Sequence, residues 1–168
     1  MKKHIVNKEF NVIVFDLNGT ITSRISDNPA HIRFRNEYIK KRLGRDINIK
    51  LPDTTSLALS ICGLDVREYY HYRNDHLCWS EFHRFDPDLK QGITDLKKLG
   101  YQLVIYTDCL LTQITRTLEI LKLEDTFDLF ISKEHHFKKP TPKAFEFIAK
   151  EFECEADQLL MVGNDEEK

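Results

Sequence analysis

The segment Val12-Ile13-Val14-Phe15-Asp16-Leu17-Asn18-Gly19-Thr20 decides how the rest of the chain is interpreted. It opens with four consecutive β-forming apolar residues, a pattern typical of a strand covered on both faces in a parallel sheet. Asp16 ends this run, and Gly19 follows in the expected turn. Parallel sheets bind ligands at the carboxyl ends of their strands. Asp16 is therefore the first candidate functional residue, although an aspartate at a strand end can also be a simple turn residue.

Three further apolar runs have the same character, and helical patterns separate them. The runs cover residues 103–106, 129–131 and 159–162. A helix is expected from Asp86 and Pro87, which suit the N-cap and the first helical position, to Gly100. Apolar residues at helical spacing predict a second helix from Leu111 to Leu121 and a third that begins at Pro142. Alternating strands and helices predict an α/β fold with a Rossmann-like parallel sheet.

Residues 21–85 interrupt this alternation with helical patterns and little strand signal. Helices are expected at about 29–43, 53–62 and 65–83, and the first should turn Ile32, Tyr38, Ile39 and Leu43 toward a core. An insertion of this size directly after the first strand and turn is best interpreted as a helical cap. The predicted organisation is therefore a core of residues 1–20 and 86–168 and a cap of residues 21–85.

The composition is that of a globular protein without a membrane span. Among 168 residues, 41% are apolar, the mean hydropathy is −0.45, and the net charge is −2. These values exclude a disordered chain and a membrane protein, and they argue against a nucleic-acid binder. Four cysteines without C-x-x-C spacing predict free thiols, which favours a cytoplasmic location. The oligomeric state is left open.

The charge is unevenly distributed along the chain. Residues 1–50 carry a net charge of +6, which includes Lys40, Lys41 and Arg42, and the remainder carries −8. The basic excess is either a solvated helix face or a surface that attracts anions near a site.

Polar residues follow the predicted strands at the edge of the sheet where a ligand would bind. They are Asp16, Thr107, the turn Gly163-Asn164-Asp165 and, after the third strand, Lys139. A carboxylate can attack phosphorus, while a hydroxyl and an ammonium group hold phosphate oxygens and acidic side chains hold Mg²⁺. The set therefore suits phosphoryl transfer. His71 and His76 are five residues apart rather than four, so they are not expected to form a helical metal site.

Taken in order, these segments resemble the four motifs of the haloacid dehalogenase-like hydrolase superfamily. The segment from Asp16 to Thr20 is similar to the first motif, D-x-D-G-T, and Thr107 ends a strand as in the second. Lys139-Pro140-Thr141-Pro142-Lys143-Ala144-Phe145 matches the third motif, K-P-x-P-x-x-F, and Met161-Val162-Gly163-Asn164-Asp165 resembles the start of the fourth. The resemblance covers essentially the whole chain, and the insertion after the first motif places it with the helical-capped branch.

The resemblance implies a role for each site residue. Asp16 would be the nucleophile that forms an aspartyl-phosphate, and Lys139 would steady both Asp16 and the phosphate. Thr107, with Asp108 beside it, would bind the transferred phosphoryl group. Mg²⁺ would be the cofactor, and its ligands would be Asp16, the backbone carbonyl of Asn18, Asp165 and Glu166. The implied substrate is a small phosphomonoester of the nucleotide or sugar-phosphate type.

Two departures from the family pattern bear on activity. Position 18 is Asn where the phosphatases carry a second Asp as general acid and base. An amide cannot donate a proton to a leaving group or take one from water. Asn164 replaces the first acid of the fourth motif, and the chain ends at Lys168. A catalytically impaired binding module and a haloacid dehalogenase-type hydrolase therefore remain alternatives. The apolar run at 159–162 would also form a bare sheet edge, which predicts a truncated chain or a covering partner.

Overall fold

The computed structural model describes residues 9–24, 28–135, 137, 139 and 141–164. The chain divides into two compact units: Met1–Thr22 with His83–Lys168, and Ser23–Phe82. The sequence placed these divisions at 20/21 and 85/86. We call the first unit the core unit and the second the helical unit.

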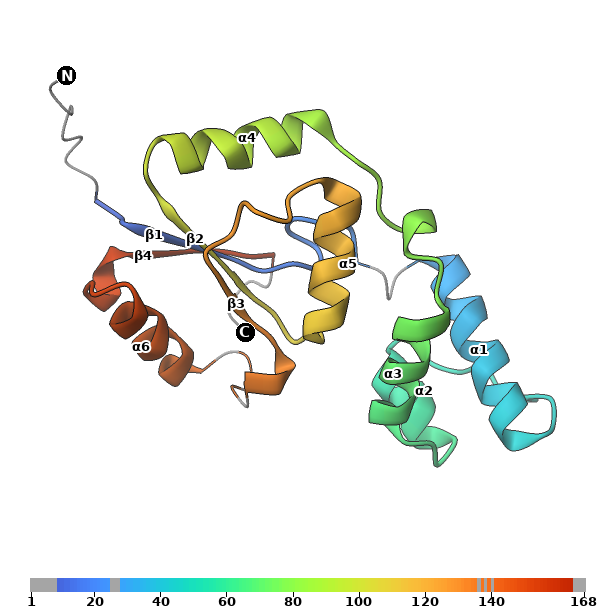
Figure 1. The fold of residues 1–168 in the computed structure, drawn as a ribbon. Helices are drawn as coiled ribbons and strands as arrows, with labels where there is room; N and C mark the ends of the chain where they lie inside the picture. The colour runs from blue at the N-terminus through green and yellow to red at the C-terminus, as the bar shows by residue number, and fades with distance from the viewer. Residues whose placement is uncertain (1–8, 25–27, 136, 138, 140, 165–168) are drawn as a thin grey trace, which may run out of the picture. The chain divides into compact units, whose positions relative to one another are not determined.

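The core unit contains a parallel four-stranded sheet with the order β3-β2-β1-β4 (Figure 1). Its strands are β1 (Val12–Phe15), β2 (Gln102–Tyr106), β3 (Leu129–Ile131) and β4 (Leu159–Val162). From β1 the chain adds β2 and β3 on one side and then returns to place β4 on the other. The strand order therefore reverses at β1, and the crevice at such a switch point is where open α/β sheets bind ligands.

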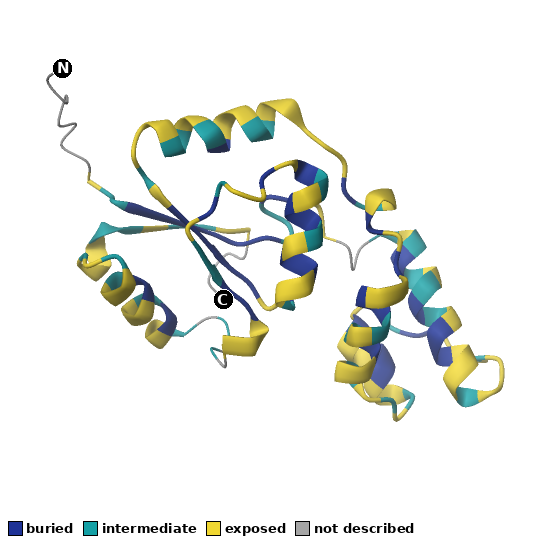
Figure 2. Ribbon diagram, in the orientation of Figure 1, coloured by how far each residue is buried: buried dark blue, intermediate teal, exposed yellow. Residues whose placement is uncertain are grey.

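Helices cover both faces of this sheet, because both faces of its strands are apolar. The helices are α4 (Pro87–Lys98), α5 (Leu111–Leu121) and α6 (Pro142–Glu151). Alternate strand residues point to opposite faces, so Ile13 and Phe15 pack with α4 and α5, while Val12 and Val14 pack with α6. Figure 2 shows these helices buried toward the sheet and exposed on their outer sides.

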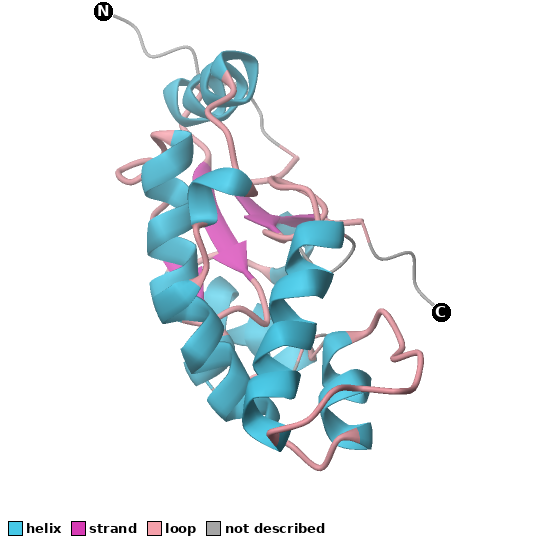
Figure 3. Cartoon of the chain, turned by 90° about the vertical axis from the view of Figure 1, so that its right-hand side faces the viewer, coloured by secondary structure: helices cyan, strands magenta, loops and turns pink. Residues whose placement is uncertain are grey.

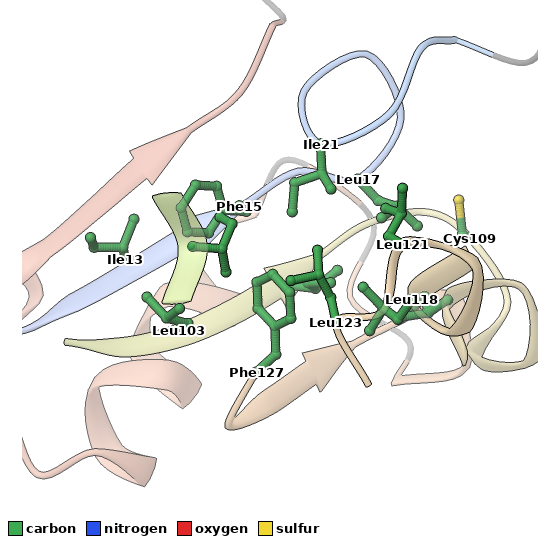
Figure 4. Close-up of a cluster of buried hydrophobic side chains, with 13 residues drawn as sticks. Ile13, Phe15, Leu17, Ile21, Leu103, Cys109, Leu118, Leu121, Leu123 and Phe127 are labelled. Carbon is green, nitrogen blue, oxygen red and sulfur yellow. The ribbon is translucent and has the colours of Figure 1, made fainter. Parts of the chain in front are cut away.

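The larger apolar cluster lies beneath α4 and α5 and reaches the end of the sheet that carries Asp16. Figure 4 shows Leu17 and Ile21, which follow β1, together with Leu118, Leu121 and other residues of this cluster. Burial of each such side chain stabilises the fold by about 1.5–3 kcal/mol. The loop after β1 is therefore held by its own apolar side chains.

The start of α4 agrees with its expected N-cap. The side chain of Asp86 accepts hydrogen bonds from the backbone N–H groups of Asp88 and Leu89, and Pro87 is the first helical residue. Together these features fix where α4 begins.

The described part of the helical unit forms helices and loops and contributes no strand to the sheet (Figure 3). Its helices are α1 (Pro29–Leu43), α2 (Thr55–Ile61) and α3 (Val66–His76). The predicted helix at 65–83 was wrong over residues 77–83. The helix ends at His76, and Leu77 leaves the helical conformation before a short 3₁₀ turn, Trp79–Glu81. Within the described residues, no helix is long and apolar enough to cross a membrane.

The buried side of α1 is more polar than expected. His31 and Arg35 are buried beside Tyr38 and Ile39, whereas Ile32 is only half-buried. The Arg35 guanidinium is satisfied because it donates to the backbone carbonyls of Pro52 and Asp53, each at 2.8 Å. Buried charge of this kind is tolerated when it is hydrogen-bonded.

The basic residues at the end of α1 are engaged in local surface contacts. Lys40 pairs with Asp46, Arg42 pairs with Glu68, and the Lys41 ammonium lies over the Tyr72 ring. These contacts agree with the solvated helix face, one of the two interpretations of the basic excess.

His31 makes the stability of the helical unit sensitive to acid. Its Nε2 lies 3.1 Å from the Tyr69 hydroxyl, and burial, assisted by Arg73 and Arg35, lowers the pKa of His31 to about 4. In the unfolded chain a histidine has a pKa near 6.5. Between pH 6.5 and pH 4, His31 is therefore protonated in the unfolded chain but neutral in the folded chain. Stability is therefore lost as the pH falls from about 6.5 toward 4.

We predict that the free energy of unfolding falls by about 2 kcal/mol between pH 7 and pH 5 because of His31. Trp79 is buried in the helical unit and is the one tryptophan of the chain, so its fluorescence during urea titration reports this unit. His31→Gln should lose most of the acid sensitivity. His71→Gln, which changes an exposed side chain, should keep it. Equal pH dependence in wild type and His31→Gln would contradict this assignment.

Candidate active site

Asp16 is held at the switch point by its neighbours in the sheet. Its backbone N–H donates to the carbonyl of Val162 at the end of β4, at 2.9 Å. Its carboxylate Oδ1 accepts the N–H of Leu17 at 2.8 Å and pairs with the Lys139 Nζ at 2.9 Å. Neither of these side-chain contacts involves Oδ2. The two paired side chains are 9% and 15% exposed, so little solvent screens the ion pair.

The Lys139 ammonium makes a second contact besides the one with Asp16. It is 5.7 Å from the centre of the Tyr106 ring, within the range of a cation–π contact. Tyr106 ends β2, is 1% exposed and meets Phe145 of α6 edge to face. Burial raises the pKa of Tyr106, so its ring stays neutral. The lysine is thus fixed between the ends of β1 and β2 and the start of α6.

A cysteine connects the loops after β1 and β2. The Asn18 side-chain amide donates to the Cys109 Sγ at 2.9 Å, and the Thr107 hydroxyl donates to the same sulfur at 3.3 Å. The Oδ1 of Asn18 accepts a hydrogen bond from the Thr22 hydroxyl at 3.4 Å. Cys109 lies at one end of the apolar cluster (Figure 4) and is buried. Sequence reasoning missed this contact, although the cysteine follows Thr107 by only two residues.

The turn after β4 runs close to Asp16. A methyl group added at Gly163 would lie 3.9 Å from the Asp16 Cβ and 3.4 Å from the Met161 side chain, which are ordinary van der Waals contacts. The predicted metal ligands Asp165 and Glu166, two and three residues further on, lie outside the described residues.

The donor chemistry at this sheet edge fits Mg²⁺, which prefers oxygen and commonly uses one or two carboxylates together with substrate phosphate. Asp16 would supply a carboxylate and Asn18 a backbone carbonyl. The Asn18 side chain is hydrogen-bonded to Cys109 and Thr22. Across residues 9–24, 28–135, 137, 139 and 141–164, no group of three or more His, Cys, Asp or Glu side chains gathers to hold a metal. A complete protein-only cage is therefore not present in this part.

The remaining predicted site residue, Asp108, follows Thr107 and has an exposed side chain. The loops that carry Asp16, Asn18, Thr107 and Lys139 are brought together by the contacts above. A separate hollow of about 440 Å³ lies in the helical unit, against α1 and residues 47–53, and contains none of the predicted site residues.

Comparison with known proteins identifies the family. The model of the haloacid dehalogenase-like hydrolases matches residues 13–168. A phosphoglycolate phosphatase of Neisseria gonorrhoeae is 26% identical over 90% of this chain and 71% of its own length. A glyceraldehyde 3-phosphate phosphatase of Pyrococcus abyssi is 34% identical over 98% of this chain and 61% of its own length. Pyrophosphatase PpaX of Bacillus cereus is 24% identical over 93% of this chain and 75% of its own length.

Solved structures share the fold. A phosphatase of this family from Thermococcus onnurineus has a TM-score of 0.65 and is 20% identical, with 93% of this chain and 78% of the other covered. The hydrolase YfnB of Bacillus subtilis, solved with magnesium bound, has a TM-score of 0.60 and is 17% identical. The similarity covers 94% of this chain and 81% of the other. These similarities confirm the predicted α/β fold.

The ion pair between Lys139 and Asp16 should contribute to stability. We predict that Lys139→Met lowers the free energy of unfolding by about 3 kcal/mol, because it leaves a buried carboxylate without its partner. Lys143→Met, a control at an exposed lysine of the same segment, should change it by no more than about 0.5 kcal/mol. In a double-mutant cycle, adding Asp16→Asn should cancel much of the loss. Urea unfolding measures all four free energies, and strictly additive effects would show that the two side chains do not interact.

Proposed function

The chain belongs to the haloacid dehalogenase-like hydrolase family, and we propose that it is a phosphohydrolase for a small phosphorylated molecule, with Asp16 as the nucleophile. The observation that carries this proposal is the buried ion pair between Asp16 and Lys139 at the switch point of the sheet. A cation fixed beside a carboxylate serves two purposes: it holds the proposed nucleophile in place, and it attracts the anionic phosphoryl group toward it.

In the first step, the Oδ2 atom of Asp16 attacks phosphorus. A bond forms between this oxygen and phosphorus, and the bond between phosphorus and the leaving oxygen breaks. The leaving oxygen departs with the bonding electron pair, and Asp16 carries the phosphoryl group as an aspartyl-phosphate. Lys139 holds the phosphoryl oxygens, whose negative charge must be stabilised as the group is transferred. The Thr107 hydroxyl joins it by exchanging its hydrogen bond to the Cys109 sulfur for one to a phosphoryl oxygen.

In the second step, water attacks the phosphorus of the aspartyl-phosphate. A bond forms between the water oxygen and phosphorus, the bond to Oδ2 breaks, and its electron pair returns to the carboxylate. Inorganic phosphate leaves, and the proton lost by the water passes to solvent. Splitting one difficult displacement into two easier ones is the benefit of a covalent nucleophile. Lys139 again stabilises the carboxylate as its negative charge returns.

Mg²⁺ is the proposed cofactor, and it would neutralise phosphate charge when bound. Its proposed protein ligands are Asp16, the Asn18 carbonyl and the acidic residues Asp165 and Glu166. The helical unit is proposed to be a cap that selects the substrate, as the sequence resemblance implies. A small nucleotide or sugar phosphate remains the proposed substrate type, and the cytoplasm the proposed location.

One alternative uses the same nucleophile on a carbon–halogen bond. Asn18 favours it, because a halide leaves as an anion and needs no proton. In that reaction Asp16 would attack carbon and displace halide, and water would then hydrolyse the resulting ester. The other alternative is a binding module that retains the fold without turnover.

We predict that wild-type protein with Mg²⁺ hydrolyses p-nitrophenyl phosphate and that Asp16→Asn abolishes this activity, because an amide is not a nucleophile for phosphorus. Release of p-nitrophenolate measures the rate. Asp88→Asn, which changes an aspartate of α4 far along the chain from the site, is the control and should retain activity. No turnover by wild type above background would favour the binding module.

Removal of the metal distinguishes the proposed phosphohydrolase from the dehalogenase-type alternative. We predict that a chelator suppresses release of inorganic phosphate and that added Mg²⁺ restores it, since the ion offsets charge on the phosphate. A parallel assay follows halide release from 2-chloropropionate in the presence of the chelator. Halide release that depends on Asp16, with no phosphate release either with Mg²⁺ or with the chelator, would show that the protein is a dehalogenase and not a phosphohydrolase.

A further inference from the structure

We propose that Glu134 is a positioning residue for phosphate binding, because it holds in place the segment that carries the Thr107 hydroxyl. This inference rests on the proposed phosphohydrolase function, in which Thr107 binds the phosphoryl group. Glu134 lies outside the four motif segments. Two segments of the core unit carry the inference: residues 107–111 after β2, called the β2 loop, and residues 132–135 after β3, called the β3 loop.

The two loops continue the pairing of β2 with β3 beyond the ends of these strands. The Thr107 N–H donates to the last carbonyl of β3 at 2.9 Å, and the Lys133 N–H donates to the Cys109 carbonyl at 2.9 Å. Glu134 makes the next contact, because the Leu111 N–H donates to its two carboxylate oxygens at 3.2 and 3.1 Å. The β2 loop is therefore bonded to the β3 side at every second residue, and Glu134 provides the contact at the far end.

Glu134 also supplies the cap for α5. This helix begins at Leu111, and the residue at its N-cap position, Leu110, makes no side-chain capping hydrogen bond. A leucine side chain has no acceptor, whereas the first N–H groups of a helix need one. The Glu134 carboxylate satisfies one of them, and its negative charge suits the positive end of the helix dipole. The start of α5 is thus joined to the β3 loop.

Ser132 fixes the orientation of the Glu134 carboxylate. Ser132 is 1% exposed, and its hydroxyl donates to the Glu134 Oε2 at 2.5 Å and accepts the Glu134 backbone N–H at 3.3 Å. Partial burial acts to raise the pKa of Glu134, but the hydrogen bonds from Ser132 and Leu111, with His135 nearby, outweigh it and lower the pKa. Although Glu134 as a whole is exposed, its carboxylate is therefore ionised and aimed at α5 at neutral pH.

The β2 loop in turn sets the position of the Thr107 hydroxyl. This hydroxyl donates to the Cys109 Sγ at 3.3 Å and accepts the Cys109 backbone N–H at 3.4 Å. The second contact holds the oxygen in place when the hydroxyl proton turns to a phosphoryl oxygen. Loss of the Glu134 contact releases the α5 end of the loop, so that Cys109 and the hydroxyl bonded to it shift. A shifted hydroxyl binds phosphate less well, because hydrogen bonds weaken steeply with poor geometry.

The first test is the affinity for inorganic phosphate, measured on the full chain with Mg²⁺ by isothermal titration calorimetry. Glu134→Ala should raise the Kd for phosphate and the KM for p-nitrophenyl phosphate by about 3–10-fold, the factor that one hydrogen bond's net contribution implies. Glu134→Gln should raise them less, because its neutral oxygen is a weaker acceptor. The value of kcat should change less than KM, since Asp16 and Lys139 are untouched. Glu119→Ala, at an exposed glutamate of α5, is the control and should keep the wild-type values.

A double-mutant cycle shows whether Glu134 acts through Thr107. Thr107→Val removes the hydroxyl and keeps the shape of the side chain. In this background Glu134→Ala should change the Kd for phosphate by less than about twofold, because the group that it positions is gone.

A second cycle separates positioning from helix capping. Leu110 has extended backbone at the N-cap position, so Leu110→Asp offers α5 a cap from its own sequence. In the Leu110→Asp background, Glu134→Ala should cost little free energy of unfolding. It should still raise the Kd for phosphate about 3–10-fold, because the new cap does not join α5 to the β3 loop.

The outcomes separate this inference from the proposed function. An unchanged Kd in Glu134→Ala, or an equal rise in the presence and absence of the Thr107 hydroxyl, overturns the inference and leaves the phosphohydrolase intact. Recovery of both stability and phosphate affinity through Leu110→Asp makes Glu134 a helix cap alone and also overturns it. Wild type that binds phosphate without turnover removes the phosphohydrolase, while the comparison of Kd values still decides the role of Glu134. Wild type that neither binds phosphate nor turns over removes both.

Discussion

The ion pair between Asp16 and Lys139 is the interaction on which the candidate site depends. It joins the end of β1 to the segment before α6, and the Tyr106 ring at the end of β2 supports the lysine from another side. Parallel strands place these ends at one edge of the sheet, and the strand order reverses at β1, the position at which open α/β sheets bind ligands. A buried carboxylate without its cation would be costly, so the same contact that stabilises this edge also holds the proposed nucleophile in place.

Most of the core unit could be predicted because its local signals agree with one another. Continuous apolar runs identified all four strands, and Asp86 with Pro87 identified the start of α4. The helical unit was less predictable. The buried side of α1 includes His31 and Arg35, whose burial depends on partners from distant segments, such as Tyr69 and the carbonyls of residues 52 and 53. Periodicity of apolar residues cannot reveal a polar side chain that is buried by such contacts.

The candidate site, too, could be predicted from the sequence only in part. Asp16, Thr107 and Lys139 were named because each follows a predicted strand, and the family resemblance added Asn18. The contacts that give these residues their environment could not be foreseen. Cys109 beside Asn18 and Tyr106 beneath Lys139 are both apolar positions in the sequence pattern, and only their three-dimensional placement shows what they hold.

The most direct test of the central claim is to locate the covalent intermediate. After brief incubation with acetyl phosphate and Mg²⁺, borohydride reduces an aspartyl-phosphate to homoserine, and peptide mass spectrometry identifies the modified position. The account predicts reduction at Asp16 and at no other acidic residue, with none in protein that was not exposed to acetyl phosphate. Phosphate release without modification of Asp16, or modification at another carboxylate, would contradict it.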